Sequence, residues 1–310
     1  MNINSEVIIL LCSNIAINQN VNPFNPSEWS RFAEKLMKSG LTPSSLISMS
    51  VAEYNRLLNL TYKECERIEK LLARKKLLFS ELKKYADMGI YVITRADAEY
   101  PKMLKSKLKQ NSPPLFYCFG DVNILKRECA GFVGSRNIND NDIKFIEKTV
   151  NKINYSGYAV VSGGARGTDS TAEIQSIRNN NFVVEYVPDS LINRAEVKGK
   201  FFNNIIMLSA VEPDAEFTTV SAMTRNRYIY AHSIGTVVVK SDYKKGGTWH
   251  GAFDCIKRGI SPVFCRSLNI SGNAGLIRFG AIPIDENWDG DIKKFIVSES
   301  QKDIQLSFFD

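Results

Sequence analysis

The stretch VVSGGARGTDSTAE, residues 160–173, contains the pattern that best indicates how this chain folds. Two valines predict the end of a strand, the glycines that follow predict a tight turn, and residues 170–178 predict a helix. Thr168 or Asp169 is placed to cap that helix. A strand, a glycine turn and a helix in this order can hold a phosphate, because free N–H groups at the amino end of a helix favour an anion.

The spacing within this stretch excludes two common nucleotide sites. The lysine of a GxxxxGK[ST] loop is missing, and so is the GxGxxG spacing of a dinucleotide site. The stretch therefore predicts an anion-binding turn and leaves open whether the anion belongs to a small nucleotide or to a nucleic acid. We expect Asp169 to cap or orient rather than to catalyse, since aspartates beside a helix start more often do so.

From Ile90 onward, short apolar runs alternate with helical stretches such as residues 142–153. The runs are IYVIT, LFYCFG, CAGFVGS, YAVVSGG, FVVEYVP, NIIMLSA, TVVVKS and SPVFCRS. Their alternation with helices predicts an α/β fold with a doubly wound, mostly parallel sheet. Ligands of such folds bind beyond the carboxyl ends of the strands, so the loops after the strands are expected to carry the function.

The first part of the chain has helical spacing instead. The segment FNPSEWSRFAEKLMKSG predicts a helix capped by Asn25 that stops at Gly40, and YKECERIEKLLARKKLLFSELKKYADMG predicts one long helix that ends at Gly89. We therefore expect a small helical domain at 1–88, a sheet domain at 89–290 and a polar tail at 291–310.

Composition places the chain among ordinary globular proteins. Hydrophobic residues make up 44% and charged residues 24%, and the net charge of +7 permits a polyanionic partner without requiring one. The six cysteines include no CxxC pair, so we expect free thiols and no metal. The apolar run at Val7–Cys12 is too short to cross a membrane and follows no basic segment. We expect a cytoplasmic protein.

Four loops at predicted strand ends are rich in glycine or in basic residues. They are GFVGSRN, the opening stretch, TRNRYIYAHS, whose arginines open a helical segment, and SDYKKGGTWHG. In a parallel sheet these loops converge, and together they predict one anion site. Neither His232 nor His250 belongs to a metal-ligand pattern, and no GxSxG elbow is present. The site is thus expected to bind its ligand without transforming it.

Five segments stand in an order that is similar to that of a known family. They are Val133–Arg136 (VGSR), Ser162–Asp169 (SGGARGTD), Arg225–Ala231 (RNRYIYA), Gly246–Thr248 (GGT) and Ser271–Ala281 (SGNAGLIRFGA). The series resembles the DNA-processing proteins of the DprA family, also called Smf.

This resemblance implies an extended Rossmann domain preceded by a domain similar to a sterile alpha motif. It implies a non-enzymatic protein, without cofactor, that binds single-stranded DNA, hands it to a RecA-type recombinase during DNA uptake, and forms a homodimer. The implied DNA contacts are Gly134, Ser135, Arg136, Gly163, Gly164, Arg166, Gly167, Arg225, Asn226, Arg227, Lys245, Gly246, Gly247 and Thr248.

Two features depart from or extend this pattern. Lys240 stands where the family usually carries an acidic residue. This departure keeps open a different biological function, on a mobile element or in defence. The tail segment Gln305–Phe309 (QLSFF) resembles a peptide that docks on the bacterial sliding clamp, and packing on its own domain is the alternative.

Two other functions remain open at this point. The GGT loop also resembles the nucleoside phosphohydrolases of the LOG family, but the catalytic glutamate of their PGGxGTxxE segment has no counterpart in KGGTWHGAFD. The third possibility is a sensor that binds a small nucleotide in the same pocket. A long basic surface would favour DNA, and a closed pocket would favour the nucleotide.

Overall fold

The structure is a computed structural model that describes residues 1–17, 21–198 and 203–294. The segment Gln305–Phe309 lies outside the described residues. Within them, nine strands form one sheet in the order β1-β2-β6-β5-β4-β3-β7-β8-β9. Neighbouring strands from β6 to β9 run parallel, and β1 and β2 pair antiparallel at one edge. The predicted fold class is confirmed.

The strand bounds follow the apolar runs of the sequence. They are β1 Ile90–Thr94, β2 Leu115–Gly120, β3 Cys129–Val133, β4 Ala159–Ser162, β5 Val183–Tyr186, β6 Ile205–Ser209, β7 Ser233–Val238, β8 Val263–Arg266 and β9 Ile282–Ile284. All eight predicted runs form strands. The pattern missed β9, because three residues around Pro283 carry too little apolar alternation to be recognised.

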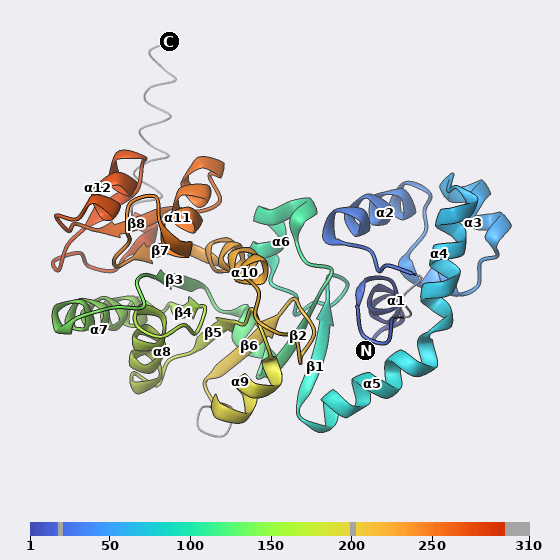
Figure 1. Ribbon diagram of the computed structural model, residues 1–310, viewed down its shortest axis with the longest axis horizontal. Helices are drawn as coiled ribbons and strands as arrows, with labels where there is room; N and C mark the ends of the chain where they lie inside the picture. Colours follow the sequence, from blue (N-terminus) through green and yellow to red (C-terminus); the bar gives the residue numbers. More distant parts are fainter. Residues whose placement is uncertain (18–20, 199–202, 295–310) are drawn as a thin grey trace, which may run out of the picture.

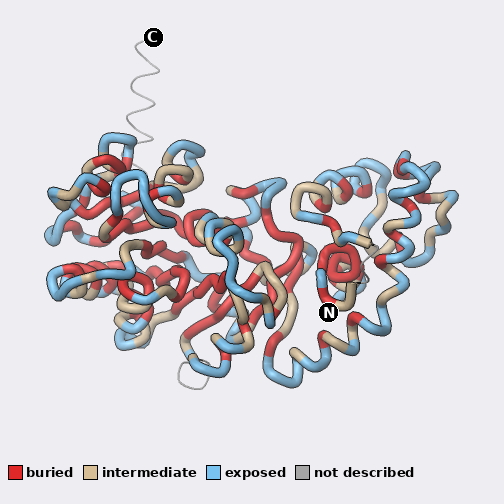
Figure 2. Tube along the Cα trace, viewed as in Figure 1, coloured by how far each residue is buried: buried red, intermediate tan, exposed pale blue. Residues whose placement is uncertain are grey.

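Helices cover both faces of the sheet (Figure 1). The helices on one face are α7 Asp140–Tyr155, α8 Thr168–Arg178 and α9 Leu191–Lys198. The helices on the other face are α6 Lys102–Leu108, α10 Thr219–His232, α11 Gly246–Arg258 and α12 Ser271–Arg278. Successive strand residues point to opposite faces, so Val160 packs with the first group and Val161 with the second. Figure 2 shows that the strands between these helices consist mainly of buried residues.

The helical part wraps around one buried helix, α1 (Ile3–Cys12), which Figure 1 shows end-on. The other helices of this part are α2 Pro26–Lys38, η1 Pro43–Ile47 (a short 3-10 helix), α3 Val51–Leu58, α4 Tyr62–Ala73 and α5 Lys75–Asp87. Two more 3-10 helices, η2 Lys109–Asn111 and η3 Val122–Lys126, lie between β1 and β3. The Asn25 cap is confirmed, and its capping box uses Glu28.

The single long helix expected before Gly89 is wrong, because the chain divides at Arg74 into α4 and α5. The Arg74 guanidinium donates to the carbonyl oxygens of Ile15 at 2.6 Å and Ser13 at 2.7 Å, beyond the end of α1. Arg74 also donates to the carbonyl oxygen of Leu10 in the last turn of α1, so the residue at which the long helix divides caps the end of the central helix.

The helical part and the sheet share apolar core. Residues Val7–Leu11 of α1 belong to the same buried cluster as Tyr117 of β2, and the Ser13 and Tyr117 hydroxyls lie 2.8 Å apart. The domain limits at 88 and 290 stay predictions. No helix among the described residues is long and apolar enough to cross a membrane.

Replacing Arg74 with methionine should lower the free energy of unfolding by about 2–3 kcal/mol, because several carbonyl oxygens lose a charged donor. Urea unfolding followed by circular dichroism measures the change. Lys75→Met is the matched control, since the neighbouring Lys75 side chain is 57% exposed and pairs only with Glu6 among the described residues. We expect a change below about 1 kcal/mol there. Equal losses in both variants would contradict the role given to Arg74.

Candidate functional site

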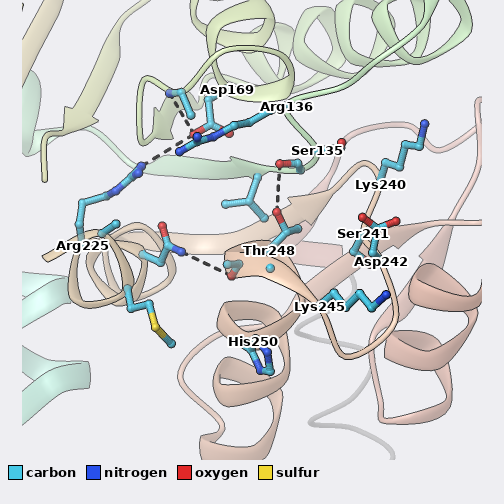
Figure 3. Close-up of a pocket in the computed structure, with 18 of the residues that line it drawn as sticks. Ser135, Arg136, Asp169, Arg225, Lys240, Ser241, Asp242, Lys245, Thr248 and His250 are labelled. Carbon is cyan, nitrogen blue, oxygen red and sulfur yellow. Dashed lines mark hydrogen bonds and ion pairs between the residues drawn. The ribbon is translucent and has the colours of Figure 1, made fainter. Parts of the chain in front are cut away.

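A cavity of about 530 Å³ opens at the carboxyl edge of the sheet (Figure 3). In the sheet, β3 lies between β4 and β7. The chain continues from β3 to β4 on one side and reaches β7 on the other side only later, so the loops at the carboxyl ends of these strands diverge and leave a space between them. The lining residues are Val133, Gly134, Ser135, Arg136, Ala165, Asp169, Phe217, Thr219, Ala222, Met223, Arg225, Asn226, Tyr230, Lys240, Ser241, Asp242, Lys245, Gly246, Gly247, Thr248 and His250. The predicted convergence of strand-end loops thus produces a single cavity.

Three exposed or partly exposed cations line this cavity together with the start of α11, and we call this set the cationic wall: Arg136, Lys240 and Lys245. Arg136 and Lys245 are exposed, and Lys240 is partly exposed while its ammonium lies 3.5 Å from the Asp142 carboxylate. The N-cap residue of α11 is Lys245, whose side chain accepts no hydrogen bond, so no side-chain cap covers the first N–H groups of the helix. The wall therefore combines flexible cations with a helix amino end that attracts anions.

The cavity also has an apolar wall, formed by Phe217, Ala222 and Met223. Phe217 is 54% exposed and Met223 is 50% exposed. Both come from the segment between β6 and the first turns of α10. Large apolar side chains left in water beside cations indicate a ligand that has both an anionic and a flat apolar part.

The floor contains a buried ion pair between Asp169 of α8 and Arg225 of α10, with Nη1 and Oδ2 3.8 Å apart. Arg225 is only 7% exposed, so this implied DNA contact is a buried side chain. The guanidinium lies directly against Gly163, where an added Cβ would come within 0.9 Å of Nη1. A side chain at position 163 would occupy the place of the Arg225 guanidinium, so this packing requires glycine. Gly163 itself does not line the cavity.

Asp169 orients Arg225 rather than capping α8. The helix begins at Thr168 with Gly167 in the N-cap position, so capping by Thr168 or Asp169 is wrong. The Thr168 hydroxyl donates instead to the carbonyl oxygen of Ser135. Burial raises the pKa of the Asp169 carboxyl to about 6, and the positive charge of Arg225 opposes this increase.

The turn after β4 covers a second group of buried charges. Lys198 donates to both Glu173 and Glu185 at 2.6 Å, and Arg194 donates to the carbonyl oxygen of Gly164 at 3.1 Å. Burial, and then the charge of Glu173, raise the pKa of Glu185. An added Cβ at Gly164 would lie 2.0 Å from a Glu185 oxygen, so this glycine also serves close packing.

The cavity brings together only part of the predicted contact set. It contains Gly134, Ser135, Arg136, Arg225, Asn226, Lys245, Gly246, Gly247 and Thr248, and it leaves out Gly163, Gly164, Arg166, Gly167 and Arg227.

The residues left out have other neighbours. An added Cβ at Gly167 would lie 2.6 Å from the backbone oxygens of Ser135 and Arg136. Arg166 is exposed and donates to Asn137, and the Arg227 guanidinium lies 3.3 Å from Asp254.

Several lining residues were not among the predicted contacts. Lys240 comes two residues after the end of β7, so its place near a strand end was a usable signal. Phe217, in the loop before α10, and Met223, in the first turns of α10, had no local signal, because only the fold turns this segment toward the cavity. His250 lies at the cavity as an exposed side chain.

The family model described as DNA recombination-mediator protein A matches residues 91–291. The chain belongs to this family. A relative from Bacillus subtilis (strain 168), DNA processing protein DprA, is 25% identical over 181 residues, which cover 56% of this chain and 60% of that protein. The DprA family prediction is confirmed, although the chain matches less than two thirds of this relative's length.

Two solved structures show the same fold as this family member. DprA from Streptococcus pneumoniae aligns with a TM-score of 0.63 at 22% identity, over 84% of this chain and 95% of that one. DNA processing protein A from Helicobacter pylori, whose single-stranded DNA binding mode that structure describes, aligns with a TM-score of 0.55 at 22% identity, over 69% and 96%. At 22% identity, these two similarities establish a shared fold.

Proton binding to Asp169 predicts how stability depends on pH. The folded pKa of about 6 exceeds the ordinary 3.8, so between these values the folded state binds more protons than the unfolded one. Unfolding free energy should therefore fall as pH rises through this window, by on the order of 2 kcal/mol from this group. Urea unfolding at several pH values should show this fall in the native protein and a flatter profile in Asp169→Asn. Parallel profiles would contradict the assignment.

Proposed function

We propose that this family member binds single-stranded DNA across the cavity, with phosphates on the cationic wall and bases on the apolar wall. The observation that carries the proposal is that both walls face one space at the carboxyl edge of the sheet. A nucleotide strand carries an anionic backbone on one side and flat, apolar faces on the other. The match in chemistry agrees with the DNA-binding role described for the Helicobacter pylori relative.

The phosphate side would use Arg136, Lys240, Lys245 and the N–H groups at the start of α11. Arginine and lysine side chains and backbone N–H groups contact phosphate oxygens without reading the sequence. Lys240 also touches Asp142, which is itself held by Arg266 at 2.6 Å, so Asp142 keeps one strong partner when Lys240 turns to a phosphate. The cations here can therefore serve the ligand at little cost to the fold.

The base side would use Phe217 and Met223. Stacking of bases on exposed aromatic side chains tolerates any sequence, because every base has a flat face. A strand held in this way binds with little overall sequence preference and with affinity that falls as salt rises.

The finer parts of the function rest on family membership. We propose that the protein acts in the cytoplasm as a homodimer that hands its DNA to a RecA-type recombinase, and that it has no enzymatic activity. Docking on a sliding clamp through Gln305–Phe309 stays a proposal about residues outside the described ones. Against a phosphohydrolase, the α11 carboxylate of Asp254 is held by Arg227 and Arg258 and does not line the cavity.

Removing one phosphate contact should weaken binding and lower its salt dependence. Arg136→Ala and Lys245→Ala should each reduce affinity for a fluorescent oligo-dT and reduce the slope of log K against log salt by about 0.7. Fluorescence anisotropy from about 50 to 200 mM salt measures both quantities. Arg227→Ala is the matched control, since it removes the same charge outside the cavity.

Three outcomes would count against the proposal. The native protein could fail to bind oligo-dT at low salt, both cavity variants could bind as the native protein does, or Arg227→Ala could cause the same loss as Arg136→Ala. Hydrolysis of a nucleoside monophosphate by the purified protein would support the phosphohydrolase instead.

A further inference from the structure

A second, smaller pocket lies where the helical part meets the sheet, beside the β1–β2 edge that Figure 1 shows. Its volume is about 230 Å³, and it shares no residue with the cavity described above. The residues that line it come from the end of α1, the start of α2, the start of β2, the segment after β6, and α10. We call it the proline-lined pocket, after Pro23, Pro26, Pro113 and Pro114.

Within the part of the chain that the structure describes, Glu212 is the one charged side chain that lines this pocket. The Asn14 amide donates to the Glu212 Oε1 atom at 2.7 Å, and no described cation forms a salt bridge with this carboxylate. A carboxylate accepts at two oxygens, so one amide leaves most of its capacity unused. Arg74 reaches the carbonyl oxygen of Ser13 from behind and does not line the pocket. The pocket therefore favours a cationic ligand.

A tyrosine hydroxyl in the same pocket also lacks a partner. Tyr228 is 6% exposed, and its ring packs on Phe116 with the two centroids 5.5 Å apart. The Tyr228 hydroxyl makes no hydrogen bond within the described residues, yet it is not one of the polar atoms there that the protein encloses completely. The Tyr117 hydroxyl, by contrast, lies 2.8 Å from the Ser13 hydroxyl. A nearly buried hydroxyl that is open to this pocket indicates a ligand group that can donate to it.

We infer that the proline-lined pocket binds an arginine side chain of a partner protein. The guanidinium would donate to the Glu212 carboxylate and to the Tyr228 oxygen, and its apolar stem would lie on the prolines and the Phe24 ring. A guanidinium has several N–H donors in one plane and is more weakly hydrated than an ammonium, so it suits a small pocket with two separate acceptors. This interaction goes beyond DNA binding and does not depend on it.

The size and the surroundings of the pocket favour a protein segment over a free small molecule. Pockets that enclose small ligands usually measure about 300–1,000 Å³, and this one is smaller. The loop of Glu212 continues with Asp214 and Glu216, which are exposed and form no salt bridge with a described residue. This acidic loop interrupts the surface of a protein whose net charge is +7. A segment with further basic residues beside its arginine would complement it.

The first experiment uses the native protein and two peptides, KGRGK and the same peptide with citrulline in place of arginine. Citrulline keeps the shape of the side chain and removes its charge, while the lysines stay. Saturation-transfer NMR should give an affinity about tenfold lower for the citrulline peptide, because the carboxylate loses a charged donor. Equal affinities, or no binding of either peptide, would overturn the inference and would leave the binding of oligo-dT untouched.

Agmatine separates the two sources of a guanidinium. It carries this group on an apolar stem without a peptide chain or flanking lysines, and it should bind more weakly than KGRGK. Agmatine that binds as tightly as KGRGK would overturn the assignment to a protein segment.

The last experiment assigns the binding to the pocket. Glu212→Gln should reduce the affinity for KGRGK about tenfold and Tyr228→Phe about fivefold, the losses expected for a charged and a neutral hydrogen bond. Glu69→Gln is the matched control, because Glu69 is an exposed carboxylate on α4 outside the pocket and has no salt bridge among the described residues. It should keep the native affinity. Circular dichroism checks that the variants fold, and the peptide comparison on the native protein needs no variant. Native affinity in both pocket variants, or an equal loss in Glu69→Gln, would overturn the inference.

Discussion

The arrangement of the cavity depends on the contact between Asp169, Arg225 and Gly163. Asp169 belongs to the part of the chain that follows β4, and Arg225 belongs to the helix that leads into β7. Their ion pair joins the two halves of the sheet across the point where the strand order reverses. The guanidinium fits only because Gly163 has no side chain, so the glycine turn is required by packing as much as by conformation.

The buried charges beneath the same turn extend this constraint. Glu173, Glu185 and Lys198 are held together, and Arg194 ties them to the turn through the carbonyl oxygen of Gly164. A cluster of this kind tolerates the loss of one partner badly, because a charge would then be left alone in a poorly solvated place. The turn that resembles a phosphate loop thus largely covers buried protein charges, and most residues that line the cavity come from the neighbouring loops.

Much of the fold could be predicted from the sequence, because strands and helices are recognised by local periodicity. The runs from IYVIT to SPVFCRS needed only their own residues to be identified. The division of the long N-terminal helix could not be seen, since it depends on Arg74 meeting carbonyl oxygens about 60 positions earlier in the chain. The same limit applies to the site. Arg136 and Lys245 follow strands or open helices, whereas the burial of Arg225 depends on Gly163, a residue distant in sequence.

The two edges of the sheet have a consequence for how copies of this chain can meet. An open strand edge presents unpaired N–H and C=O groups that can pair with another molecule. Here one edge strand, β9, has three residues and contains Pro283, which has no N–H to donate. At the other edge, β1 packs against α1 and α5. Joining two copies edge to edge through their sheets is therefore disfavoured.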